Sequence, residues 1–201
     1  MKIKFEYSIL LFFLGFLLGK NHTVLSAVII CAIIHESGHL LCAKALNIKI
    51  KEMVIDVGGA KIYPVSSSYS YAHELLLAFS GPTFNLLCIL FLNITLNEKV
   101  NVSIISHTTY TDLSFVEYVY VFSLMQAILN LLPINTLDGG RMLRCILCIL
   151  ASERIGDVAI RISTLIFALI LWILSVYFLL GSGGGISLFV FSICMLLKIF
   201  E

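Results

Sequence analysis

The chain consists of long apolar runs that are separated by short polar breaks. A helix that crosses a bilayer of about 30 Å needs about 20 predominantly apolar residues. The pattern predicts about six transmembrane helices, at Phe5–Leu18, Val24–Ala43, Tyr71–Leu96, Phe115–Leu132, Ala159–Leu180 and Ile186–Phe200. The first run also resembles a signal peptide, but no small-x-small cleavage site follows it, so we interpret it as a span.

One segment between the predicted spans has a different period. Residues Ile48–Val57 alternate apolar and polar side chains over most of their length, and a glycine pair and a second short run, Ala60–Tyr63, follow. Alternation followed by a glycine pair is typical of a β-hairpin. The predicted fold class is therefore an all-α polytopic membrane protein with a small membrane-associated β-hairpin, and we expect residues 1–201 to form a single domain.

Composition and charge agree with a membrane protein. Of 201 residues, 60% are hydrophobic and 12% are charged, against about 25% charged in a typical soluble domain. The mean hydropathy is +1.04. These values exclude an ordinary soluble globule and a disordered chain. A net charge of +1 gives no basic face for nucleic acid, so no nucleic-acid partner is expected.

The distribution of basic residues predicts the orientation of the spans. Of the 13 Lys and Arg residues, only Lys20 and Lys99 fall on one side of a six-span arrangement. Cytoplasmic loops carry the excess of Lys and Arg. We therefore expect a multi-pass protein, of a bacterial cell membrane, with both termini in the cytoplasm.

The second predicted span contains His35, Glu36 and His39. Residues i and i+4 share one face of a helix, so both imidazoles can reach one metal ion, with Glu36 close enough to act on a water molecule. Ionisable groups inside a membrane helix cost several kcal/mol unless they are paired, hydrated or bound to a metal. The alternatives are that these three side chains satisfy one another or line a proton path.

A catalytic zinc site needs a third protein ligand and an open position. Asp138 is the best candidate, because the apolar run before it is interrupted by Pro133 and followed by Gly139 and Gly140. Interrupted helices at membrane depth are tolerated where they line a cavity or lie within protein. Taken alone, an aspartate before two glycines is more often a turn residue.

Three motifs together resemble the site-2 protease family of intramembrane zinc metalloproteases, and among them the stage IV sporulation protein FB type. They are His35–His39 for the metal helix, Ser80–Asn85 for the small-Gly-Pro-x-x-Asn element, and Asn130–Gly139 for the second metal motif. The resemblance covers a catalytic core of about residues 24–145, and the C-terminal helices at about 159–200 lie outside it. Many members have a proline where this chain has Thr136.

The resemblance implies a role for each matching residue. His35, His39 and Asp138 would bind one zinc ion per chain, and Glu36 would be the general base and later the proton donor. Asn130 would hold the substrate backbone or the developing oxyanion.

The resemblance also implies how substrate binds. The hairpin would present an unpaired strand edge, with Ile50 and Val54 as candidate substrate-binding residues. Asn85 could form a hydrogen bond between helices or contact substrate, and we favour the first.

The implied activity is hydrolysis of a peptide bond in a membrane-embedded protein substrate near the cytoplasmic face. Release of a membrane-tethered transcription factor, and a membrane regulatory partner, follow from the resemblance alone. The rival hypothesis is a metal-binding transport or scaffold protein without hydrolytic activity, although binding alone would not need Glu36. The cysteines lie almost entirely in apolar runs and are interpreted as free buried thiols, Cys145 and Cys148 included.

Overall fold

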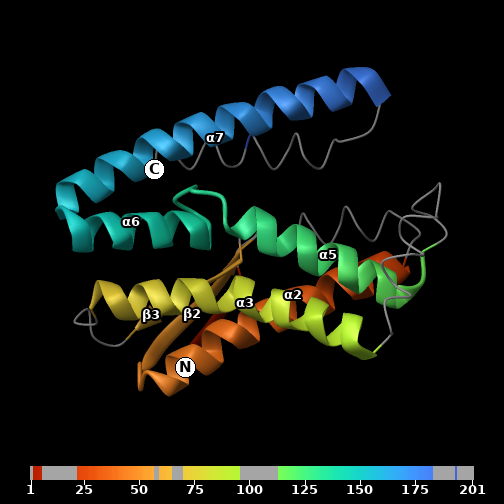
Figure 1. Ribbon diagram of the computed structural model, residues 1–201, viewed down its shortest axis with the longest axis horizontal. Coiled ribbons are helices and arrows are strands. Elements are labelled where there is room, and N and C mark those ends of the chain that lie inside the picture. Colours follow the sequence, from red (N-terminus) through yellow and green to blue (C-terminus); the bar gives the residue numbers. More distant parts are fainter. Residues whose placement is uncertain are drawn as a thin grey trace. The chain divides into compact units, whose positions relative to one another are not determined.

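The computed structural model describes residues 2–5, 22–56, 59–64, 70–95, 113–182 and 193. The elements in these ranges are β1 (Lys2–Phe5), α2 (His22–Ala45), β2 (Ile50–Asp56), β3 (Gly59–Pro64), α3 (Tyr71–Thr95), α5 (Phe115–Asn130), α6 (Asp138–Leu150) and α7 (Glu153–Ser182) (Figure 1). Contacts divide the chain into two compact units, Met1–Tyr69 with Leu76–Asn130, and Ser70–Leu75 with Leu131–Glu201. A single domain over residues 1–201 stays a prediction.

Helices form where four of the predicted spans lie. Three of them are long and apolar enough to cross a membrane, at His22–Ala45, Tyr71–Thr95 and Glu153–Phe178, whereas α5 is apolar but shorter. Many large apolar side chains of these helices are exposed, as lipid-facing residues would be. The structure therefore indicates a mostly helical membrane protein. The other two predicted spans lie almost entirely outside the described residues, and six spans stay a prediction.

In the first unit, α2 packs against α5 and α3. The core between α2 and α5 contains Ala27, Cys31, Tyr118 and Val119. The backbone of α3 passes close to Gly38 of α2, because a Cβ added at Gly38 would lie 2.6 Å from the Ser80 carbonyl oxygen. This small residue lets α2 and α3 approach closely, as small residues do between membrane helices.

The sequence explains where two of these helices start or stop. At the start of α5, the Glu117 Oε2 accepts a hydrogen bond of 2.6 Å from the Ser114 N–H, and the Ser114 Oγ lies 3.4 Å from the Glu117 N–H. This reciprocal arrangement is a capping box. After α2, Asn47 has a φ of 56°, and such a left-handed residue ends a helix.

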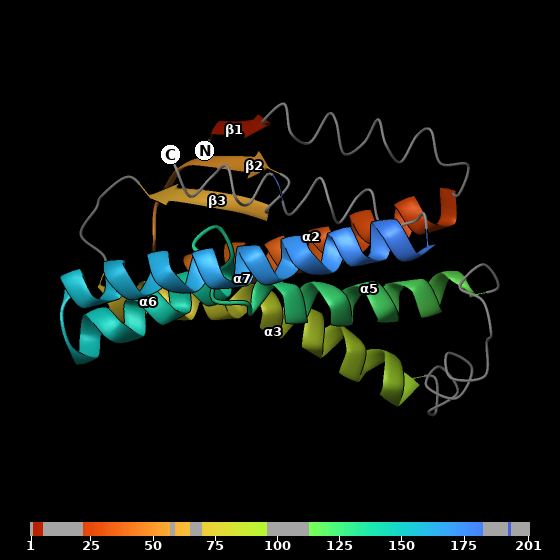
Figure 2. The same cartoon turned by 90° about the horizontal axis from the view of Figure 1, so that it is seen from above.

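The strands of the first unit form a three-stranded sheet in the order β1-β2-β3 (Figure 2). The β2 and β3 strands are antiparallel, and β1 pairs with β2 in parallel. Val54 therefore has the partner Lys4 on one side and Lys61 on the other. The N-terminal residues therefore occupy the β2 edge of the hairpin at Val54, and the substrate-binding role of Ile50 and Val54 stays a prediction. Among the strands within the described ranges, none pairs with the outer edge of β3.

Strand β1 was not expected from the sequence. The apolar pattern predicts that Phe5 begins the first span, but Phe5 is the last residue of β1. Its backbone pairs with that of Ile55, and Lys4 and Glu52 form an ion pair of 2.6 Å. Four residues carry too little periodicity to predict a strand, and the partner strand lies some fifty residues further along the chain, so only tertiary pairing creates β1.

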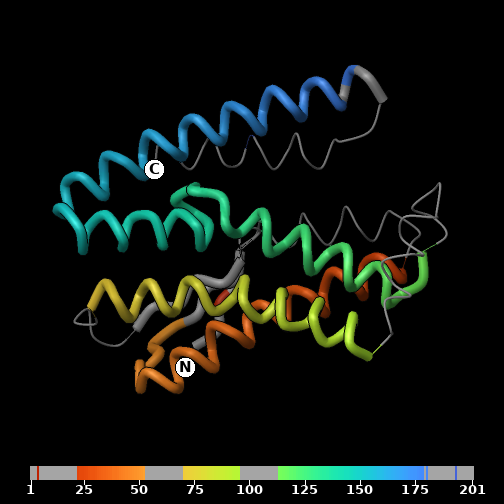
Figure 3. The backbone as a smooth tube through the Cα atoms, viewed as in Figure 1, coloured from red at the N-terminus to blue at the C-terminus, as the bar shows by residue number. Residues whose placement is uncertain are grey.

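In the second unit, α6 and α7 run back along each other after a short turn (Figure 3). Gly156 allows their close approach, because an added Cβ would lie 2.7 Å from the Cys148 Sγ. The Arg144 Nε donates a hydrogen bond of 2.7 Å to the Asp157 Oδ1, which raises the pKa of the guanidinium. The sequence places the polar residues Ser152, Glu153 and Arg154 at this point, and the turn between the helices begins at Ala151.

Candidate functional site

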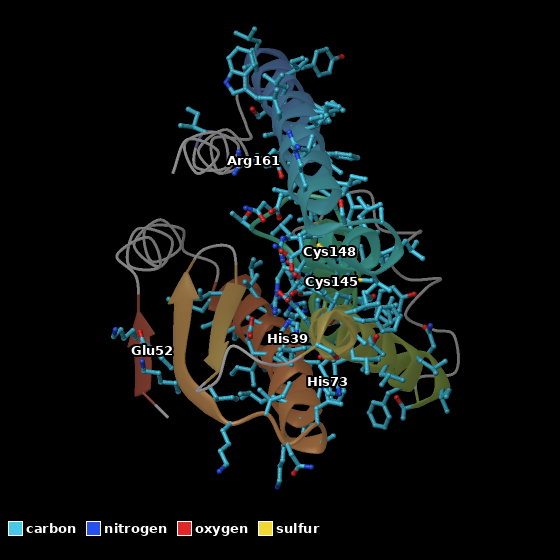
Figure 4. The ribbon with its side chains drawn as sticks, turned by 90° about the vertical axis from the view of Figure 1, so that its left-hand side faces the viewer. His39, Glu52, His73, Cys145, Cys148 and Arg161 are labelled. Atoms are coloured by element: carbon cyan, nitrogen blue, oxygen red, sulfur yellow. The ribbon has the colours of Figure 1, made fainter. Side chains whose placement is uncertain are left out.

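The two histidines of the second helix lie side by side. One turn of α2 separates His35 from His39, so both project from the same face, and each is only 2% exposed. Their Nε2 atoms are 3.3 Å apart. In Figure 4, His39 lies between α2 and α3. The prediction that both imidazoles share one face is confirmed.

The backbone of α3 determines which nitrogen of His39 carries the proton. The His39 Nδ1 is 2.8 Å from the Leu77 carbonyl oxygen and 3.3 Å from the Ser80 Oγ. A carbonyl oxygen can only accept, so Nδ1 must be the N–H that donates to it. The other nitrogen, Nε2, then carries a lone pair that points toward His35.

Two asparagine side chains reach His35 from different helices. The Asn85 Nδ2 of α3 is 3.4 Å from the His35 Nδ1, and the Asn130 Nδ2 at the end of α5 is 3.4 Å from the His35 Nε2. Both amides are buried, Asn85 completely so. The structure thus brings both predicted asparagines to the histidine pair, and Asn85 bonds across helices rather than being exposed.

A glycine on α3 leaves room beside the two imidazoles. A Cβ added at Gly81 would lie 2.4 Å from the His39 Nε2 and 2.7 Å from the His35 Nε2. Gly81 belongs to the small-Gly-Pro-x-x-Asn motif, and no local pattern in the sequence indicates that it faces the imidazoles. Two buried, facing ring nitrogens with this space beside them fit a metal ion, because neutral imidazole nitrogen is the commonest protein ligand for zinc.

The acidic residue of the motif also lies on α2. Glu36 follows His35 directly and is half-buried, and its Oε2 atom is buried. The helix therefore presents a carboxylate next to a potential metal ligand. A carboxylate in such a place can act as a general base toward a nearby water molecule.

The second unit holds Asp138 as the first residue of α6, where it is 8% exposed. The residue before it, Leu137, is extended, with φ −105° and ψ 162°. The positive end of the helix dipole stabilises a carboxylate in the first turn. The Arg141 Nη1 is 3.7 Å from the Asp138 Oδ1, and the Arg141 Nε is 3.7 Å from the Glu74 Oε1. Asp138 is thus a buried helix-start residue rather than a turn residue.

The two glycines after Asp138 hold the preceding loop against α6. A Cβ at Gly139 would lie 2.2 Å from the Leu131 carbonyl oxygen, and one at Gly140 would lie 2.0 Å from the Ile134 carbonyl oxygen. Helix α7 supports the same loop, because its Thr164 Oγ1 accepts a hydrogen bond of 2.8 Å from the Asn135 N–H. The Gly-Gly pair therefore positions the loop that leads to Asp138.

Helix α6 carries two cysteines, Cys145 and Cys148. Cys145 is fully buried, and burial raises the pKa of its thiol to about 12. Figure 4 labels Cys145 and Cys148 on α6. Both are free, as are the other cysteines within the described ranges. A thiol that stays protonated is a poor ligand and nucleophile, which agrees with the interpretation of Cys145 as a buried apolar residue, whereas Cys148 is half-buried.

The fold and the site define a membrane protein with a buried histidine pair suited to a metal ion. Residues 95–174, which include Asn130 and Asp138, match the sequence model of Peptidase family M50. The chain is also similar to the solved structure of a site-2 protease from Methanocaldococcus jannaschii, with a TM-score of 0.70 and 20% sequence identity over 98% of this chain and 88% of that one. No curated protein sequence matches the chain. The structural likeness establishes the fold, and the family match supports a metalloprotease.

Proposed function

We propose that the protein is a zinc-dependent intramembrane protease that hydrolyses a peptide bond in or near a transmembrane segment of a membrane-tethered protein. The observation that carries this proposal is the pair of buried imidazoles, His35 and His39, whose Nε2 atoms are 3.3 Å apart beside Gly81. Facing lone pairs in a buried place repel each other unless a cation or a proton lies between them. The family match and the fold support the same conclusion.

The third ligand in this proposal is Asp138. His35, His39 and Asp138 are all buried and of the residue types that hold a metal ion. Chain connectivity supports the assignment, since Asn130 contacts His35 and only seven residues separate it from Asp138. That loop is not extended, because the Ile134 N–H donates a hydrogen bond of 2.8 Å to the Leu132 carbonyl oxygen. Two histidines and one carboxylate are a known ligand set of catalytic zinc.

The residues around the ligands then have distinct tasks. Zinc, when bound, would supply Lewis-acid activation of water and of the scissile carbonyl. Glu36 accepts a proton from the attacking water and later returns it to the leaving amine. Asn130 donates a hydrogen bond from its Nδ2 to the substrate carbonyl oxygen, where negative charge develops.

The sheet supplies a place where an unwound substrate strand can bind. A helical substrate keeps its carbonyl groups hydrogen-bonded, so cleavage requires local unwinding and replacement bonds. We propose that the outer edge of β3 (Gly59–Pro64) forms those bonds, in place of the β2 edge that carries Ile50 and Val54. The register supports this choice, because Val54 is paired on both sides.

A proline scan tests the β3 edge. Proline lacks the N–H and removes one backbone bond. Single prolines at residues 60–63 should alternate in effect, because successive N–H groups point inward to β2 and outward to the free edge. Proline variants at the outward positions should lose cleavage and retain zinc. The Ile3→Pro variant, on the opposite edge of the sheet, should cleave normally. Equal cleavage by all four β3 variants would remove this edge from the mechanism.

The substrate class and regulation rest on the motif resemblance alone. They comprise a membrane-tethered transcription factor, cleavage near the cytoplasmic face, and a membrane regulatory partner, as in the stage IV sporulation protein FB type. Co-expression with such a tethered candidate, in the presence and absence of a candidate regulator, would test this part. The proposed substrate class would be wrong if no transcription-factor candidate were cleaved while another membrane-tethered protein was.

The central experiment compares the native chain with Glu36→Gln, using a membrane-tethered reporter substrate and zinc analysis of the purified protein. The substitution keeps size and removes the base, so cleavage should be lost while one zinc per chain is retained. Equal processing by both proteins, with zinc bound, would favour a metal-binding transport or scaffold protein. A native chain without zinc would refute the metal centre itself.

A further inference from the structure

We infer that Asn85 is a positioning residue that accepts a hydrogen bond from the His35 Nδ1–H and thereby directs the His35 Nε2 lone pair to the metal. The inference rests on the proposed metal centre and deepens it. Asn85 projects from α3, is completely buried, and lies 3.4 Å from His35, which projects from α2. All the atoms involved belong to the first unit.

The first step concerns the proton of His35. The Asn130 amide reaches the His35 Nε2 with its Nδ2, at 3.4 Å. The same Nε2 faces the His39 Nε2 at 3.3 Å, so it is the nitrogen whose lone pair the proposed metal ion would take. A neutral imidazole with a lone pair on Nε2 carries its proton on Nδ1. His39 has the same tautomer, because its Nδ1 donates to the Leu77 carbonyl oxygen.

The second step concerns the partner of that proton. The atom next to the His35 Nδ1 is the Asn85 Nδ2, and the Asn85 Oδ1 is buried with no hydrogen-bond partner among the described residues. An amide group can turn by 180° within the same space, which exchanges oxygen and nitrogen. Turned in this way, Oδ1 accepts the Nδ1–H of His35, and the buried oxygen gains a partner.

The third step is the consequence for the metal. A metal-binding histidine almost always donates its other N–H to an acceptor, which fixes the ring and makes the ligand nitrogen more basic. For His39 that acceptor is the Leu77 carbonyl oxygen. For His35 it is Asn85. A side chain that only packed α3 against α2 would not need a polar atom at this completely buried position.

The test measures zinc affinity of the full chain in detergent, by competition with a chromophoric chelator, together with the visible spectrum of the cobalt-loaded protein. Asn85→Leu removes the acceptor, and Asn85→Asp retains it. Thr83→Val is the matched control, because it removes the hydrogen bond between the Thr83 Oγ1 and the Phe79 carbonyl oxygen on the same helix, outside the site. Asn85→Leu should bind zinc about 10- to 100-fold more weakly, and its cobalt spectrum should change. Asn85→Asp and Thr83→Val should bind like the native chain.

Native affinity in Asn85→Leu would overturn the inference, as would a loss in Asn85→Asp as large as that in Asn85→Leu. If Asn85→Leu does not fold, Asn85→Asp decides alone: near-native affinity supports an acceptor role, and a loss of tenfold or more overturns it. A native chain that binds zinc, with all variants equal to it, refutes the role of Asn85 and leaves the proposed function intact. A native chain that binds no zinc refutes both.

Discussion

The replacement Gly81→Ala adds one methyl group at the most crowded point beside the histidine pair. The new Cβ would lie 2.4 Å from the His39 Nε2 and 2.7 Å from the His35 Nε2. Ordinary contact begins at 3.4 Å, so the rings would have to retreat by 1.0 Å and 0.7 Å respectively. Neither ring can do so freely, because hydrogen bonds hold His39 to Leu77 and His35 to two asparagines.

Such a displacement is large on the scale of metal coordination. Ligand distances in metal sites hold to about 0.2 Å, and the methyl group would itself occupy space beside both nitrogens. We therefore expect zinc affinity to fall at least about 100-fold, which is about 2.7 kcal/mol. Helix propensity acts in the opposite direction, because alanine is more favourable than glycine in a helix by about 1 kcal/mol. A loss of metal would thus come from the site and not from the backbone of α3.

The assay is the zinc content and zinc affinity of the purified chain, with thermal unfolding as a check on the fold. Gly38→Ala is a matched control, since its Cβ would lie 2.6 Å from the Ser80 carbonyl oxygen and 2.9 Å from the Phe84 Cγ. It should cost about 1–3 kcal/mol of stability through overpacking and still bind zinc. Native zinc affinity in Gly81→Ala would refute the reasoning, because the methyl group would then not reach the imidazoles.

Further predictions concern the second unit. Asp138→Ala should abolish stoichiometric zinc in elemental analysis while the chain stays folded, because catalytic zinc needs three protein ligands; retained zinc would remove this carboxylate from the site. Gly140→Ala should lower the unfolding temperature and the zinc content together, since its Cβ would lie 2.0 Å from the rigid Ile134 carbonyl, and unchanged values would contradict the packing described for that loop. Burial raises the Cys145 thiol pKa from its ordinary value to about 12, so between pH 7 and 9 it stays protonated, and mass spectrometry should find it unalkylated until the protein is denatured. The half-buried Cys148 serves as the internal comparison, and equal labelling of both cysteines would disprove that burial.

Periodic features were the predictable ones. Runs of apolar residues predicted the positions of α2, α3, α5 and α7 to within a few residues at most ends, because a lipid-facing helix must be apolar along its length. The four-residue interval between the two histidines predicted their common face. Short features were less predictable: β1 has only four residues. Helix α7 begins at Glu153, before the predicted start at Ala159, because Glu153, Arg154 and Asp157 interrupt the apolar run without ending the helix.

The sequence by itself determined the membrane character, the main helices and the kinds of side chain available for chemistry, because length, hydropathy and helical spacing are local properties of the chain. Tertiary structure decided what those side chains meet. It placed Gly81 against two imidazoles, joined the Leu77 carbonyl to His39, brought Asn85 and Asn130 to His35, and gave β2 a second neighbour, β1. Each of these contacts joins residues distant along the chain, and their meeting depends on how helices and strands pack rather than on any local pattern.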